Sequence, residues 1–114
     1  MEFNLDIGKV VGNMVQASSN SLIKGGKQAE DFATHEYAQF IRDIEYIQTM
    51  AEKGTITLET AQALVEQHKF SMQEVLLTIE GLGLIAVQNA INAALQVLNN
   101  VLTTSLGAAF KFAL

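Results

Sequence analysis

The two histidines, His35 and His68, are the side chains of this sequence best suited to chemistry, because imidazole titrates near neutral pH and binds metal ions. A metal site built on helices needs a carboxylate three positions before each histidine, on the same helix face. Glu36 directly follows His35, and Glu66 precedes His68 by two positions, so neither carboxylate shares a face with its histidine. We therefore expect no metal site.

His68 has a further possible role, because it falls in a predicted apolar seam between Val65 and Met72. The simplest interpretation is a boundary histidine that reaches solvent or a hydrogen-bond partner. The alternative is a pH-sensitive seam, because a buried imidazole that becomes charged below about pH 6.5 would loosen the packing around it. If two helices pair about the predicted turn near residue 55, His68 lies opposite residues 42–44.

Other catalytic or cofactor motifs are weak. Cysteine is absent, which removes thiolate chemistry and disulfides, and the carboxylates fall on the polar faces of predicted helices. Residues 81–86, with the sequence GLGLIA, match a dinucleotide-binding pattern that requires a preceding strand and an acidic residue about twenty positions later. The preceding segment has helical periodicity, and no Asp or Glu follows Glu80. We expect neither an enzyme nor a cofactor.

The composition predicts one small all-α domain spanning residues 1–114, with helix-forming residues throughout and no proline. Only 17% of the residues are charged, against about 25% in an average soluble domain. The net charge is −5 and the densest basic cluster is the pair Lys24 and Lys27, so a nucleic-acid interface is not expected. Residues 1–6 are acidic rather than basic, which predicts no signal peptide and a protein that is cytoplasmic or exported without one.

Apolar residues recur at alternating steps of three and four along most of the chain, which predicts helices over residues 3–23 and 28–53 and a third helix that starts after an N-cap at Thr57. Glycine-containing turns are predicted at residues 24–27 and 53–57. The second and third helices should therefore form an antiparallel hairpin, preceded by a short N-terminal helix.

The segment around Gly81 and Gly83 allows two interpretations. Because it contains no polar turn residue, we expect a kinked continuation that gives one long C-terminal helix over residues 58–105, roughly 70 Å in length. The alternative is a reversal at Gly81 that packs the last helix against the first in a closed four-helix bundle.

Residues 81–110 contain no charged side chain, which divides the chain into an amphipathic part, 1–80, and a charge-poor part, 81–114. Within this run, uncharged polar residues recur every three or four positions and form one stripe on a helix that is otherwise aliphatic. A stripe of amides and hydroxyls without Lys or Glu suggests burial in an assembly. Its members are Gln88, Asn92, Gln96, Asn99 and Thr103.

The favoured interpretation is a structural, self-assembling subunit that forms a homo-oligomer, a coiled-coil assembly, or a filament or ribbon through its C-terminal helix. The aliphatic residues of that helix are the predicted interface between copies, with the amide stripe buried beside them. They are Leu82, Ile85, Val87, Ile91, Leu95, Leu98 and Leu102.

Two alternatives belong to other functional classes. Residues 82–102 are long enough to cross a bilayer, but their amides would need partners there, so the membrane alternative is an oligomeric, holin-like pore with amides lining its lumen. The other alternative is a small adaptor whose apolar tail binds a partner helix.

Overall fold

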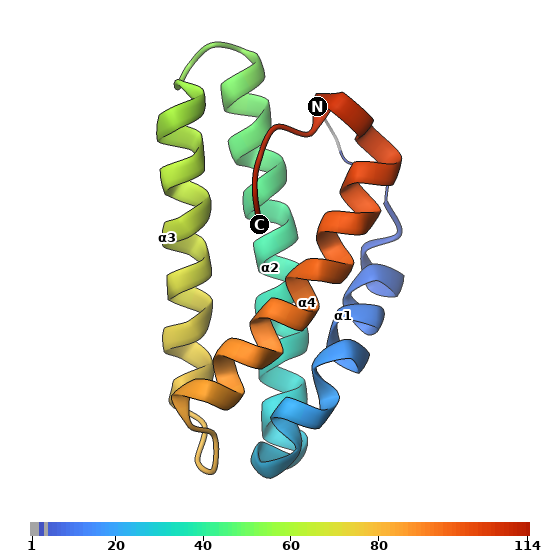
Figure 1. The fold of residues 1–114 in the computed structure, drawn as a ribbon, viewed down its shortest axis with the longest axis vertical. Helices are drawn as coiled ribbons and strands as arrows, with labels where there is room; N and C mark the ends of the chain where they lie inside the picture. The colour runs from blue at the N-terminus through green and yellow to red at the C-terminus, as the bar shows by residue number, and fades with distance from the viewer. Residues whose placement is uncertain (1–2, 4) are drawn as a thin grey trace.

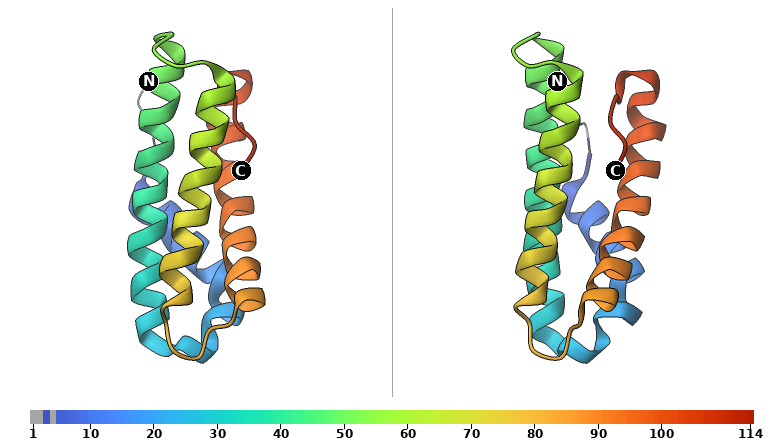
Figure 2. Two further views of the ribbon diagram at one scale, coloured as in Figure 1. Left: turned by 90° about the vertical axis from the view of Figure 1, so that its left-hand side faces the viewer. Right: turned by 60° about the vertical axis from the view of Figure 1, so that its left-hand side comes forward.

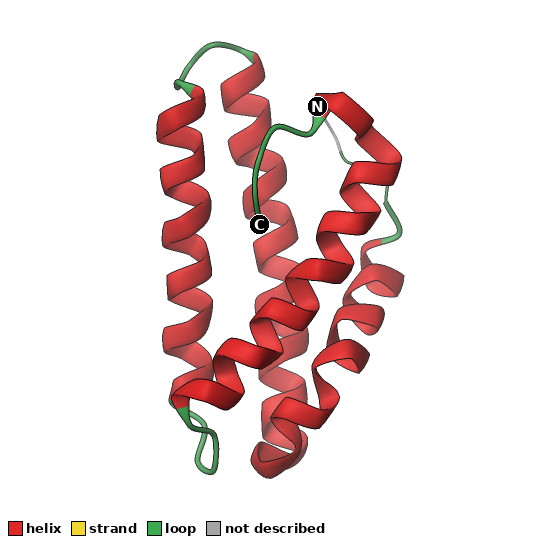
Figure 3. Ribbon diagram, viewed as in Figure 1, coloured by secondary structure: helices red, strands yellow, loops and turns green. Residues whose placement is uncertain are grey.

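The computed structural model describes every residue except 1, 2 and 4, and the described part is helical, with no strand (Figures 1 and 3). This confirms the all-α class. The elements in chain order are α1 (Ile7–Leu22), the 3-10 turn η1 (Ile23–Gly25), α2 (Gly26–Glu52), α3 (Leu58–Leu77), α4 (Leu84–Leu106) and the 3-10 turn η2 (Gly107–Ala109).

The four α-helices form an elongated bundle with principal extents of 42 × 25 × 17 Å. Helices α2 and α3 run antiparallel as the predicted hairpin, while α1 packs between α2 and α4 (Figure 1). Helices α3 and α4 meet closely only near the loop that joins them and then diverge, as the turned views in Figure 2 show. A groove consequently opens between α3 and α4.

The helix starts follow from local capping. The Asp6 carboxylate accepts a hydrogen bond from the Lys9 backbone N–H at 3.2 Å and so caps α1. The Thr57 hydroxyl oxygen accepts from the Thr60 N–H at 3.1 Å, which confirms the predicted N-cap of α3. Gly54, at φ +73°, makes the turn between α2 and α3.

The expected continuous helix over residues 58–105 is wrong, because α3 ends at Leu77 and the chain reverses before α4. Gly81 has φ +94°, and a Cβ at this position would lie 2.6 Å from the Lys24 carbonyl oxygen. The loop, residues 78–83, exposes Thr78 and Glu80 and buries Ile79 and Leu82, which pack against the α1–α2 turn at Gly25. The alternative, a reversal that packs the last helix on the first, is observed, but the bundle is not closed as predicted, because a groove separates α3 from α4.

The core joins all four helices. Its centre includes Met14 from α1, Tyr37 and Ile44 from α2, Val65 from α3 and Leu98 from α4, all fully buried. The spacing of apolar residues that predicted α2 and α3 therefore also identified residues that lie in the core.

The α1 pattern differs from expectation near its C-terminal end. Ala17, three positions after Met14, is exposed, and Ser18, four positions after Met14, is buried instead. A hydroxyl thus enters the core where the apolar spacing predicts an aliphatic side chain.

Candidate functional site

Charge is distributed unequally between the two sides of the bundle. Helices α2 and α3 carry charged side chains along their lengths, whereas α4 carries none and α1 carries only Lys9. Because α1 and α4 pack side by side (Figure 1), they form one continuous side that is almost free of charge. The C-terminal helix that the sequence singled out is therefore one half of a larger uncharged surface.

Two isoleucines protrude from this uncharged side. Ile23, at the end of α1, and Ile85, in the first turn of α4, are each 73% exposed. Both line one hollow of about 270 Å³, together with Asn20 and Asn89. Isolated exposed aliphatic residues are common, but two that share a hollow and have amides beside them mark a place where another surface can dock.

A second hollow, of about 450 Å³, adjoins the first along α1. Most of its lining is uncharged, including Gly12, Gln16 and Ser19, and it shares Asn20 and Ile23 with the first. Two charged side chains also take part, Lys24 at the first hollow and Glu30 at the second. We refer to the surface over both hollows as the α1/α4 face. Its uncharged residues are Gly12, Gln16, Ser19, Asn20, Ile23, Ile85 and Asn89.

Most of the predicted interface residues of the C-terminal helix do not lie on the surface of the molecule. Six of the seven are buried in the core of a single chain, because α4 folds back and packs its aliphatic side on α1. In this fold they cannot also form the contact between copies. Only Ile85 remains exposed; the buried ones are Leu82, Val87, Ile91, Leu95, Leu98 and Leu102.

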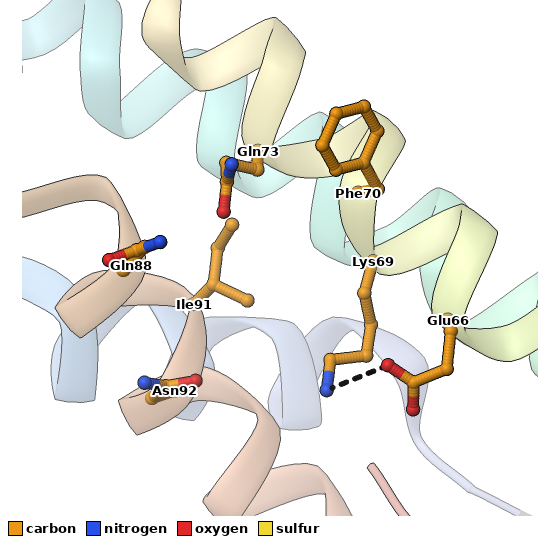
Figure 4. A pocket seen from close by; sticks show the side chains of 7 residues that line it. All are labelled: Glu66, Lys69, Phe70, Gln73, Gln88, Ile91 and Asn92. Atoms are coloured by element: carbon orange, nitrogen blue, oxygen red, sulfur yellow. Dashed lines mark ion pairs between the residues drawn. The ribbon is translucent and has the colours of Figure 1, made fainter. Parts of the chain in front are cut away.

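The predicted polar stripe is not buried within one chain. Asn99 is half-buried, and the other members are exposed. Gln88 and Asn92 face α3 across the groove, where they line a hollow of about 450 Å³ with Ile91 (Figure 4). Gln96 and Asn99 line the next stretch of the groove. Four of the five stripe residues therefore form one wall of the groove between α3 and α4.

The opposite wall of the groove comes from α3. Lys69 and Glu66 form an ion pair of 3.6 Å within this wall, and Gln73 and Phe70 lie further along it (Figure 4). The Lys69 side chain is 25% exposed, so this i,i+3 pair contributes modestly to stability. Amides on both sides and an apolar floor give the groove the chemistry to bind polypeptide backbone.

His68 lies opposite α2 as predicted, with Nδ1 3.2 Å from Oδ2 of Asp43. Its side chain is 39% exposed, so it is a boundary histidine rather than a buried one. This is the simpler of the two predicted interpretations, whereas the alternative of a pH-sensitive seam assumed a buried imidazole. His35 is 74% exposed, with Nε2 4.0 Å from Glu36.

A buried hydroxyl pair joins three helices and was not foreseen from the sequence. The oxygens of Ser18 in α1 and Tyr37 in α2 lie 2.8 Å apart, and the Ser18 oxygen is 2.9 Å from the carbonyl of Ala90 in α4 and 2.8 Å from that of Met14. Burial raises the pKa of Tyr37 above its usual value, and the hydrogen bond with Ser18 offsets part of that rise. The neutral phenol of Tyr37 therefore has a structural role, because it holds α2 against α1 and α4.

No group of three or more His, Asp or Glu side chains that could hold a metal ion comes together in the described part of the chain. The GLGLIA segment is preceded by helix α3 rather than by a strand, so its glycines serve the reversal and the start of α4. Among the described helices, none combines the length and the apolar character that crossing a membrane requires.

Comparisons of the chain with protein-family models, with curated proteins and with solved structures gave no significant match.

Proposed function

We propose that this protein is a structural subunit that self-associates through its α1/α4 face. The observation that carries the proposal is the pairing of Ile23 and Ile85, both 73% exposed, on the one side of the bundle that is almost free of charge. The proposal keeps the predicted functional class but moves the contact from the buried side of α4 to the outer surface that α4 shares with α1.

Uncharged surfaces lose less free energy than charged ones when water is removed from them. Side-chain amides such as Asn20 and Asn89 can exchange hydrogen bonds with water for hydrogen bonds with a second copy. Depletion of charge at the centre of the contact is typical of protein interfaces. Burying one exposed isoleucine contributes about 1.5–3 kcal/mol, so Ile23 and Ile85 can act as the main anchors.

The hollows beside Ile23 give the face a shape that a copy of itself can fill. A protruding isoleucine and an adjacent hollow form a self-complementary pair, the requirement for a two-fold contact between identical surfaces. The same surface would build a filament if the contact were offset rather than two-fold. The charged side, α2 and α3, would remain in water in both arrangements.

The test is a double substitution, Ile23→Lys with Ile85→Lys, measured by size-exclusion chromatography with light scattering. A lysine at the centre of a desolvated contact costs several kcal/mol, so we expect dissociation to monomers with the helical circular dichroism signal unchanged. The matched control is Tyr46→Lys, because Tyr46 is 66% exposed on α2, outside the α1/α4 face. Oligomers that persist in the double variant and dissociate in the control would place the contact on the charged side.

A further inference from the structure

The end of the chain does not continue α4 but folds back beside it. Residues 107–114, the C-terminal arm, leave the end of α4 and run along the groove between α3 and α4 (Figure 2). Phe112 is buried in the core and stands edge-on to Phe110, with ring centroids 5.8 Å apart. The arm therefore fills one end of the groove.

The side chains that hold the arm belong to the hairpin, not to α4. Gln62 of α3 pairs with the backbone of Ala113: its Nε2 donates to the Ala113 carbonyl at 2.8 Å, and its Oε1 accepts from the Ala113 N–H at 3.0 Å. Lys69 of α3 donates to the Leu114 carbonyl at 3.3 Å. Side-chain amides recognise the backbone N–H and C=O groups of an extended segment. The segment can therefore come from the same chain or from a second copy.

The uncharged stripe of α4 forms the other wall beside the arm. Asn92, Gln96 and Asn99 line a hollow of about 370 Å³ together with Ala113 and Leu114 of the arm. Beyond that hollow the groove continues into the space drawn in Figure 4. Of these three, Asn99 is half-buried and Asn92 and Gln96 are exposed, so this wall is polar and uncharged beside the arm.

Gly107 is the hinge of the arm. It ends α4 at φ +57°, a conformation that glycine adopts without strain, and a Cβ placed there would meet no atom within 4 Å. An arm that leaves its own bundle would turn about this residue, where no Cβ restricts the backbone angles.

We infer that the C-terminal arm is exchanged between copies, so that the arm of one molecule occupies the α3/α4 groove of a second. The segment that occupies this groove in the structure is residues 110–114 of this chain, and the arm of a second copy would reproduce each of its contacts. The inference rests on the proposed self-association, because copies held together on their α1/α4 faces raise the local concentration of one another's arms.

Cysteine cross-linking tests the exchange directly, because the natural chain contains no cysteine. Two differently tagged chains, one with Gln62→Cys and one with Ala113→Cys, are co-expressed, purified together and treated with a short thiol-to-thiol cross-linker. Exchange predicts a covalent pair carrying both tags. The matched control replaces Gln62→Cys with Glu74→Cys, an exposed position three turns further along α3, and should give no pair.

Two further variants make the outcome decisive. Gly107→Ala should raise the yield of the mixed pair about tenfold, because an alanine disfavours the positive φ that directs the arm back to its own bundle. A single chain that carries both cysteines reports whether the arm seats in its own groove. Cross-linking within chains only, with oligomers still present by light scattering, would overturn exchange and leave self-association intact. Monomers throughout, without a mixed pair, would overturn both.

Discussion

Ser18 shows how much one buried hydroxyl can specify in a core that is otherwise aliphatic. Its oxygen contacts groups from α1, α2 and α4, so it fixes the positions of three helices relative to one another. The close approach of α1 to the Ala90 carbonyl is possible because serine is small. No other residue type of this size could supply both the fit and the hydrogen bond to Tyr37.

Replacing Ser18 with alanine should destabilise the fold by about 1–3 kcal/mol, because the Tyr37 hydroxyl then keeps only its 3.5 Å contact with the Ala90 carbonyl. The measurement is urea denaturation followed by circular dichroism. Ser71→Ala is the matched control, since Ser71 is exposed on α3, outside the α1/α4 face, so its effect should stay within about 0.5 kcal/mol. Equal effects at both serines would mean that the buried pair contributes nothing.

The phenol of Tyr37 should make stability depend on pH in alkaline solution. Burial raises its pKa in the folded state above the usual value of 10.0, so the unfolded chain loses this proton first as the pH rises. The stabilisation is complete below about pH 10 and decreases as the pH rises through the folded-state pKa.

The measurement compares the unfolding free energy of the wild type with that of Tyr37→Phe at several pH values from 9 to 11. Their difference should shift in favour of the variant as the pH increases, because other titrating groups are common to both proteins. A difference that is constant with pH would contradict a raised pKa of Tyr37 in the folded state.

Some of the contacts between individual residues could be predicted from the sequence. The pairing of His68 with the 42–44 segment was correct because both lie on long, regular seams joined by one short turn. Ser18 was missed because a seam is recognised by apolar side chains, and a serine followed by Ser19 looks like a solvent-facing pair. Its one local signal was its position four residues after Met14, on the same helix face.

At the scale of elements, the reversal between α3 and α4 depends on the conformation of Gly81. Gly81→Ala should cost at least about 1–2 kcal/mol, because φ is +94° and the new Cβ would collide with the Lys24 carbonyl oxygen. Gly83→Ala is the control, since Gly83 has φ −98° and no atom lies within 4 Å of its Cβ position. Its thermal midpoint should stay close to that of the wild type. A Gly81→Ala variant as stable as the Gly83→Ala control would mean that the loop is not constrained as described.

The hairpin of α2 and α3 could be predicted because periodicity, a glycine turn and the Thr57 cap all indicate it locally. The reversal could not be predicted in the same way. Its cause is the packing of Ile79 and Leu82 against Gly25, more than fifty residues away in the chain, which local propensity does not report. The burial of these two side chains in a loop cannot be predicted until the surface that covers them is known.

At the scale of the whole molecule, the bundle separates charge from the surface proposed for association. The sequence indicated a charge-free C-terminal helix and from it an assembling subunit, but it could not show which side of that helix would be free. The fold uses the aliphatic side for its own core and leaves Ile85, paired with Ile23, on the outside. Four amides of the stripe line the groove between α3 and α4, and the C-terminal arm lies in part of it.

The most direct measurement of the central claim is the mass of the pure protein as a function of concentration, by size-exclusion chromatography with light scattering. The chain has a mass of 12.4 kDa, and self-association predicts a species of a whole-number multiple of it, with the population shifting toward that species as concentration rises. The Ile23→Lys, Ile85→Lys variant should remain at 12.4 kDa over the same range. A wild-type protein that stays at the monomer mass at the highest concentration reached would contradict the account.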